Sequence, residues 1–220
     1  MTAGEALDVT LLTLKVGATS TAAIAIPAVA TGYVLSRWRS PLRTLVQTVV
    51  SLPMVLPPVA VGLLLLLLFA RSAPLGRAVE ACFGAPLLLT WWAAAVASAV
   101  MSFPLFVMGA MQGFDAVPLR LEQVAASLGA SRVRVLLSIT LPHAARGLAC
   151  GAVAAFARGL GEFGATALVA GRIRGETETL SLAIYDRIEQ FQNADAVVFA
   201  ALSLALALLT IGAVELLRRK

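Results

Sequence analysis

The segment Glu122–Pro142, EQVAASLGASRVRVLLSITLP, is a weakly amphipathic and basic stretch in a chain that is otherwise strongly apolar. Apolar residues recur at helical spacing on both sides of a glycine: Leu121, Val124, Ala125 and Leu128 before it, and Val133, Leu136 and Leu137 after it. That glycine, Gly129, can end the first helix in the left-handed conformation, and Ser131 can cap the next one. The sequence therefore predicts two short helices joined at a glycine, with apolar faces that water alone does not satisfy.

The rest of the chain has the composition of an integral membrane protein. Of its 220 residues, 60% are hydrophobic and 13% are charged, and the mean hydropathy is +0.90, which is too apolar for a soluble domain. About 20 apolar residues cross the hydrocarbon core of a bilayer, and five runs approach or exceed this length: 9–35, 45–70, 87–113, 144–170 and 196–214. We therefore expect an all-α, polytopic membrane protein that forms a single domain over 1–220. The segment 118–142 is then a hairpin between spans three and four.

The Lys and Arg residues favour one orientation across the membrane. With the N-terminus outside, ten fall inside, namely Arg37, Arg39, Arg43, Arg120, Arg132, Arg134, Arg146, Arg218, Arg219 and Lys220. Five fall outside, namely Arg71, Arg77, Arg172, Arg174 and Arg187. Because cytoplasmic loops carry the excess of Lys and Arg, this count predicts an external N-terminus, a cytoplasmic hairpin and a cytoplasmic C-terminus.

Other uses of the charged and metal-binding residues are not supported by the sequence. A contiguous basic face with interleaved aromatic residues, which would indicate nucleic-acid binding, is missing. The two cysteines lie in different segments and there is a single histidine, so we expect neither a disulfide nor a metal site.

Spacing alone leaves two interpretations of the hairpin open: a helix pair on the lipid surface, or a projection that docks into a partner protein. The segment resembles the cytoplasmic coupling motif of ABC-importer permeases, a Glu-Ala-Ala pattern followed by a glycine and a Leu-Pro pair. The matching residues are Glu122, Ala125, Ala126, Gly129, Leu141 and Pro142, with Arg132 beside them; Gln123 and Val124 interrupt the triplet. The resemblance implies the type I ABC-importer permease fold, in which this hairpin sits in a cleft of the ATPase subunit and Glu122 anchors its first helix there.

Four more segments are similar to molybdate permeases and, in part, to tungstate and sulfate/thiosulfate permeases. They are SLPMVLPPVAVG (51–62), MSFPLFV (101–107), FARGLGEFGAT (156–166) and GETETLSLAIY (175–185). The resemblance implies a homodimeric permease of the bacterial inner membrane that imports molybdate, or a related oxyanion. Its implied partners are two cytoplasmic ABC ATPase subunits, which bind ATP and Mg, and a periplasmic oxyanion-binding protein. No cofactor is implied for this chain itself.

Prolines and charges inside the apolar runs are the candidates for a translocation path. Pro53, Pro57 and Pro58 bend the second run, either as plain packing or as backbone that lines a wet cavity. Arg158 and Glu162 lie near the middle of the fourth run, where a lone charge costs at least about 2.5–3.5 kcal/mol. An internal ion pair and direct anion contact by Arg158 are both open. The residues assigned to the path or gate are Pro57, Pro58, Ser102, Arg158, Glu162, Gly164 and Thr166.

No catalytic motif is present: the sequence lacks a Walker glycine loop, a Gly-x-Ser-x-Gly elbow and a His/Cys/Asp cluster. We therefore expect a transport subunit that is not an enzyme, with ATP hydrolysis on a separate chain. Two other classes compete with this interpretation. One is a self-sufficient secondary transporter, which usually contains an internal repeat that this sequence lacks. The other is a membrane assembly protein that transports nothing.

The external segment 171–195 is too long for a tight turn. Leu180, Ile184 and Ile188 are spaced four apart, which predicts a short amphipathic helix that starts after the polar stretch 176–179. Four charged residues of this segment are expected to be exposed and available to the binding protein: Arg172, Arg174, Glu176 and Glu178.

Overall fold

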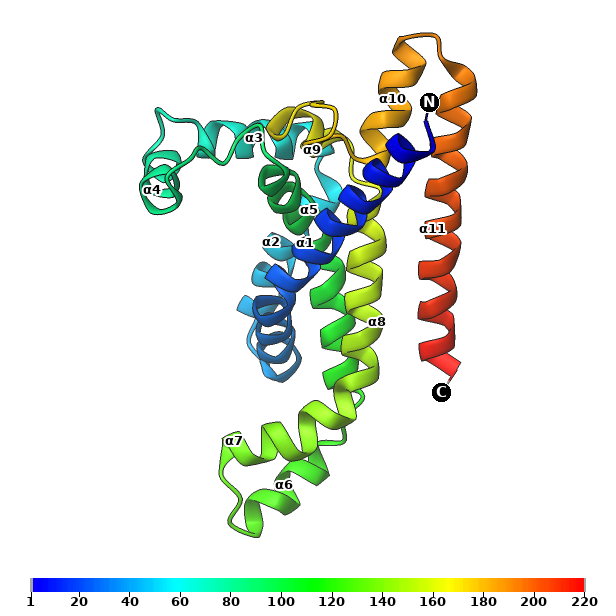
Figure 1. Cartoon of the computed structure of the whole chain (residues 1–220). Helices are drawn as coiled ribbons and strands as arrows, with labels where there is room; N and C mark the ends of the chain where they lie inside the picture. The colour runs from blue at the N-terminus through cyan, green and yellow to red at the C-terminus, as the bar shows by residue number, and fades with distance from the viewer. Residues whose placement is uncertain (1, 220) are drawn as a thin grey trace.

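The computed structural model describes residues 2–219, and every regular element in that range is a helix (Figure 1). The long helices are α1 (Ala3–Arg37), α5 (Trp91–Asp115), α8 (Leu141–Leu160) and α11 (Asn193–Arg219). The shorter ones are α2 (Leu42–Val55), α3 (Pro58–Phe69), α4 (Pro74–Phe83), α6 (Leu119–Ser127), α7 (Arg132–Val135), the π-helical turn η1 (Leu136–Thr140), α9 (Gly164–Val169) and α10 (Leu180–Glu189). The all-α prediction is confirmed.

The helices α1, α5 and α8 form the centre of the bundle, and α5 is the most buried of them. Glycines allow α5 and α8 to approach at backbone distance. A Cβ atom on Gly109 would lie 2.4 Å from the Cα atom of Gly151, and one on Gly147 would lie 2.3 Å from the Cα atom of Gly113. Since a real Cβ never comes so close, these positions tolerate only glycine without a shift of the helices. This close packing fixes the frame on which the other elements are mounted.

Four helices are long and apolar enough to cross a membrane, and the pair α2 and α3 supplies a fifth span if it is counted as one. The two helices of this pair meet at an angle of 104°. The bend falls at Pro57 and Pro58, which lack the backbone N–H groups needed to continue α2. The expected span over 45–70 is therefore a broken span rather than a straight helix.

The fourth span differs from the predicted range 144–170. Its helix is continuous from Arg132 to Leu160, so the second arm of the hairpin runs directly into the membrane helix. The π-turn η1 lies directly before Pro142 and accommodates it within the helix. A proline has no N–H to donate and would clash with the preceding turn of a regular α-helix. The chain breaks after Leu160 and resumes as the short helix α9. Arg158 consequently lies in the last turn of α8 and not near the middle of a span.

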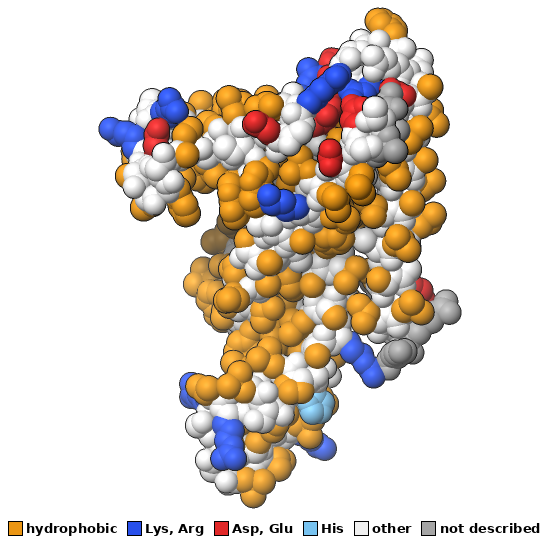
Figure 2. All heavy atoms as spheres, viewed as in Figure 1, with side chains coloured by type: hydrophobic (Ala, Val, Ile, Leu, Met, Phe, Trp, Pro, Cys, Tyr) orange, Lys and Arg blue, Asp and Glu red, His pale blue; other side chains and the backbone are white. Residues whose placement is uncertain are grey.

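Charged side chains gather mainly at the two ends of the molecule, with apolar side chains between them (Figure 2). One end carries the hairpin α6–α7, and the other carries the N-terminus with α10 (Figure 1). The amphipathic helix predicted from Leu180, Ile184 and Ile188 is confirmed as α10. Lys220, counted above for the cytoplasmic end, lies outside the described residues.

Candidate coupling hairpin and translocation path

The hairpin has the geometry that its glycine predicts. α6 ends at Ser127, and Gly129 adopts φ +83°, a left-handed conformation that favours glycine. Ser131 then caps α7, because its hydroxyl accepts a hydrogen bond from the backbone N–H of Arg134 at 3.3 Å. The turn is therefore set by local sequence, and both predicted helix ends are confirmed.

The hairpin projects beyond the helical bundle (Figure 1). Several of its apolar side chains are exposed. Leu128 at the tip is 82% exposed, and Val133 and Leu137 on the second arm are 65% and 59% exposed. Ala126, Arg132 and Pro142 are also exposed, while Ala125 and Leu141 are partly buried. Apolar area of this kind on a projecting, polar-rimmed element is typical of a protein or membrane contact.

Glu122 turns inward, toward the bundle. Its Oε1 atom accepts a hydrogen bond from Arg37 Nη2 at 2.5 Å and one from the Thr140 hydroxyl at 2.9 Å. Arg37 Nη1 also donates to the carbonyl oxygen of Phe114 at 3.1 Å. The resemblance implied that this carboxylate contacts an ATPase, but in the structure it forms hydrogen bonds within this chain. Sequence reasoning missed Arg37 as a site residue, because it was counted only as a cytoplasmic positive charge.

Two candidate path residues, Pro58 and Gly164, meet where α3 crosses α9. A Cβ atom on Gly164 would lie 2.9 Å from the Cβ atom of Pro58, and one on Gly62 would lie 2.8 Å from the Cα atom of Ala165. Each helix therefore contributes a glycine to the contact. The bend at Pro57 directs α3 across the end of the bundle to reach α9 (Figure 1).

Arg158 and Glu162 form an ion pair across the break between α8 and α9. The distance from Arg158 Nη1 to Glu162 Oε2 is 2.7 Å, and the Glu162 side chain is buried while that of Arg158 is about one-third exposed. The other carboxylate oxygen accepts the backbone N–H of Ala165 at 3.0 Å, which satisfies a free donor in the first turn of α9. The pair therefore fixes how α9 follows α8.

Ser102 and Thr166 are buried beside this break, and neither hydroxyl has a hydrogen-bond partner among the described residues. A Cβ atom on Gly159 would lie 3.4 Å from the hydroxyl oxygens of both Ser102 and Ser20, so α1, α5 and α8 meet here at small polar residues. A buried polar group without a partner is uncommon and often marks a functional position.

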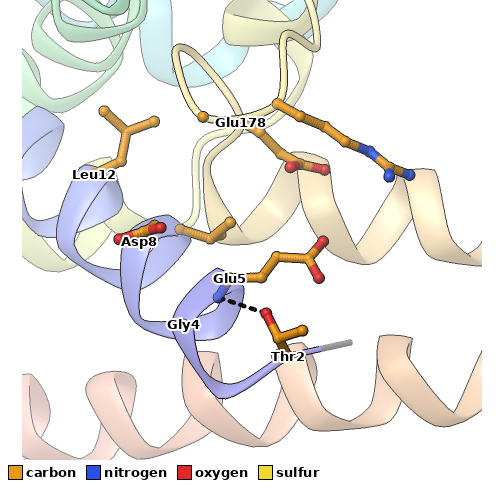
Figure 3. Close-up of a pocket in the computed structure, with 9 residues that line it drawn as sticks. Thr2, Gly4, Glu5, Asp8, Leu12 and Glu178 are labelled. Atoms are coloured by element: carbon orange, nitrogen blue, oxygen red, sulfur yellow. Dashed lines mark hydrogen bonds between the residues drawn. The ribbon is translucent and has the colours of Figure 1, made fainter.

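At the N-terminal end of the molecule, Arg187 is a buried cation that sequence reasoning treated as an exposed topology signal. It pairs with Glu5 of α1, with Glu178 at 3.7 Å and with Asp186 at 2.9 Å. A cavity of about 320 Å³ opens here, and Figure 3 shows Glu5, Asp8 and Glu178 around it. Burial raises the pKa of Glu178, while Arg187 opposes the shift. Glu178 is buried and not exposed as expected, because Arg187 holds it against the N-terminal turn of α1.

The other three charges of this segment, Arg172, Arg174 and Glu176, are exposed as predicted, and the two arginines also form ion pairs. Arg172 pairs with Glu189, and Arg174 lies 3.3 Å from Asp186. Both arginines brace the loop against α10 and stay exposed enough to meet another molecule. Within residues 2–219, no group of three or more His, Cys, Asp or Glu side chains is arranged to hold a metal ion.

Comparison with known proteins identifies the family of the chain. Residues 23–220 match the family described as the binding-protein-dependent transport system inner membrane component. The chain is 38% identical over 207 residues to the molybdenum transport system permease protein ModB of Mycobacterium tuberculosis, covering 92% of this chain and 77% of that protein. It is 44% identical over 157 residues to the molybdenum transport system permease protein ModB of Escherichia coli K12, covering 71% and 69%.

Two further similarities bear on the substrate and the fold. The chain is 34% identical to the sulfate transport system permease protein CysT of Salmonella typhimurium, covering 86% of this chain and 68% of that protein. An inward-facing structure of the MetNI methionine ABC transporter aligns with a TM-score of 0.64 at 17% identity, over 99% of both chains. That likeness shows the shared fold. The chain is a multi-pass membrane protein that belongs to the family of binding-protein-dependent transport system inner membrane components.

Proposed function

We propose that this chain is the membrane-spanning subunit of an ATP-driven importer that carries molybdate across the inner membrane. The observation that carries the proposal is the projecting hairpin, whose exposed apolar residues Leu128, Val133 and Leu137 have no cover among residues 2–219. Family membership and relatives named for molybdenum transport support the choice of substrate. Tungstate and sulfate or thiosulfate are the alternative substrates, because a sulfate permease is also similar.

The proposed assembly contains two copies of this chain, two cytoplasmic ABC ATPase subunits and a periplasmic oxyanion-binding protein. Each hairpin docks into an ATPase subunit through its apolar tip, with Gly129 at the turn and Ala126 and Arg132 on the exposed flanks. ATP and Mg bind to the ATPase, since this chain has no phosphate-binding loop. ATPase closure on ATP moves the hairpins, opens the path outward, and hydrolysis resets it.

The proposed path runs beside the break between α8 and α9. The crossing of α3 and α9 at Pro58 and Gly164 places two short helices at its outer end, where they act as the gate. The hydroxyls of Ser102 on α5 and Thr166 on α9, which have no hydrogen-bond partner among residues 2–219, are the proposed donors to a passing oxyanion. The pair Arg158–Glu162 holds α9 in place, so we assign Arg158 a structural role rather than anion binding.

The function is tested by uptake of radiolabelled molybdate, tungstate and sulfate in a strain lacking its own oxyanion permeases. Expression of this chain with its ATPase and binding protein should restore molybdate uptake above that of sulfate. A matched strain carries an ATPase whose Walker lysine is replaced, and its uptake should fall to background. Uptake that persists in that strain would indicate a self-sufficient transporter and contradict the proposal.

The proposed orientation places the N-terminus in the periplasm and the C-terminus in the cytoplasm, with the hairpin on the cytoplasmic side. Green fluorescent protein fused after the last residue should fluoresce, and alkaline phosphatase at the same place should be inactive. Alkaline phosphatase inserted after Gly84, in the loop that follows α4, should instead be active, because the proposed orientation places this loop in the periplasm. An active phosphatase at the C-terminus would overturn this orientation.

A further inference from the structure

We propose that Arg37 is a positioning residue, which joins Glu122 and Thr140 in a strut that ties the coupling hairpin to the end of the first span. The inference deepens the proposed function, and the transport experiment that tests it rests on that function. Arg37 is the last residue of α1, Glu122 lies on α6, and Thr140 closes the π-turn that leads into α8. Three elements far apart in the sequence therefore meet at one carboxylate.

The bonds of the strut are of the strong kind. Both Arg37 Nη2 and the Thr140 hydroxyl donate to the same oxygen, Glu122 Oε1, at 2.5 and 2.9 Å. Bonds between an ionised donor and an ionised acceptor are about twice as strong as neutral ones. The Arg37 and Glu122 side chains are only 20% and 17% exposed, so solvent screens the pair less than it screens a surface ion pair.

Arg37 also reaches a third helix. Its Nη1 atom donates to the carbonyl oxygen of Phe114, close to the C-terminal end of α5, at 3.1 Å. That carbonyl belongs to the negative end of the helix dipole, which favours a cation at this place. One guanidinium thus holds the ends of α1 and α5 together with the first helix of the hairpin, and its planar fork of donors suits this geometry.

The π-turn η1 connects the strut to the fourth span, because it leads directly into α8. Thr140 is buried, and its hydroxyl lies 2.9 Å from Glu122 Oε1 and 3.5 Å from the carbonyl oxygen of Val135, five residues earlier. Single π-turns inside helices occur frequently at functional sites. When α6 is displaced, Glu122 moves Arg37 and Thr140 together, so the first and fourth spans shift as a pair. Without Arg37, α6 retains its link to η1 but loses its link to α1.

The test uses the full-length chain with Arg37→Met, and Arg39→Met as the matched control. Arg39 is exposed and lies two residues after the end of α1, so Arg39→Met removes the same charge at the same end of the first span and controls for topology. Amide hydrogen exchange of the chain alone in nanodiscs should be at least tenfold faster over residues 119–127 in Arg37→Met than in the control. Because this measurement needs no ATPase and no substrate, it judges the strut even if the proposed function fails.

The second measurement is the number of molybdate ions imported per ATP hydrolysed, in proteoliposomes with the ATPase and the binding protein. Arg37→Met should lower this ratio several-fold while the ATPase still co-purifies. Arg37→Lys, which keeps the charge but gives up the fork of donors, should lie between wild type and Arg37→Met. The double variant Arg37→Met/Glu122→Gln should be no worse than the more affected single variant, because both remove one strut.

The proposed role of Arg37 is contradicted if Arg37→Met equals Arg39→Met in two measurements: the amide exchange rates over residues 119–127 and the number of molybdate ions imported per ATP hydrolysed. It is also overturned if the effects of Arg37→Met and Glu122→Gln multiply, as expected for independent sites. Should Arg37→Met fail to fold, Arg37→Lys and Glu122→Gln give the same two readouts. A wild-type complex without ATP-driven uptake would reject the proposed function and leave the exchange result to decide on the strut.

Discussion

Gly129→Val is expected to lower coupled uptake at least tenfold in a protein that still inserts into the membrane. The turn between α6 and α7 requires φ +83° at this position, which a β-branched residue adopts only with strain of about 1–3 kcal/mol. Nothing lies within 4 Å of a Cβ atom built here, so the change creates no clash inside the chain. The strain is relieved by moving the hairpin tip, and the tip is the element proposed to dock into the ATPase.

The matched control is Gly84→Val, in the turn after α4. Gly84 has φ +72° and likewise has nothing within 4 Å of a built Cβ atom, so the substitution brings the same backbone strain at the other end of the molecule. Uptake and ATP hydrolysis are measured for both variants at equal expression. Gly84→Val should retain most of the uptake, whereas Gly129→Val should hydrolyse ATP without import. Normal uptake by Gly129→Val would count against docking through the hairpin tip.

The sequence predicted the features that depend on local chemistry. Apolar runs identify membrane helices because a helix satisfies its own backbone within one segment in lipid. Four of the five expected runs overlap a helix that is long and apolar enough to cross a membrane, and the run 45–70 holds the bent pair of α2 and α3. The ends of the hairpin helices followed from Gly129 and Ser131, whose roles need only their immediate neighbours. Pro53, Pro57 and Pro58 were all predicted to bend the second run. Pro53 lies inside the continuous helix α2, and the bend falls at Pro57 and Pro58. The size of this bend, 104°, depends on packing against α9.

The features that depend on distant contacts could not be predicted. An arginine after an apolar run looks the same in the sequence whether it faces water or, like Arg37, reaches a carboxylate 85 positions away. Arg187 and Glu178 have ordinary polar neighbours in the sequence, and only the fold brings them to the N-terminal turn of α1. Hydropathy also placed the end of the fourth span too far along the chain, because the residues of α9 are apolar for a different reason: they pack against α3.

The ion pair of Arg158 and Glu162 leads to the second large effect, on stability. The Glu162 carboxylate is buried, and its charge is balanced by Arg158 at 2.7 Å. Arg158→Met leaves that charge buried and unpaired, a change that costs about 3–5 kcal/mol when both groups are fully buried. Since the arginine is about one-third exposed, we expect the lower end of that range, which corresponds to roughly a 6 °C fall in the melting temperature of the purified chain.

The double variant Arg158→Met/Glu162→Gln should recover most of that loss. Its glutamine carries no charge, and its side-chain oxygen can still accept the backbone N–H of Ala165, which Glu162 accepts at 3.0 Å. A single variant that loses a counter-charge is therefore less stable than the double variant that removes both charges. Glu162→Gln alone should be nearly neutral in stability, since it keeps the bond that starts α9 and leaves an arginine that is partly exposed. Thermal unfolding of the four proteins in one detergent gives the order directly. If Arg158→Met has the same melting temperature as wild type, the Glu162 carboxylate does not depend on Arg158 for its charge balance. The ion pair then does not hold the break between α8 and α9.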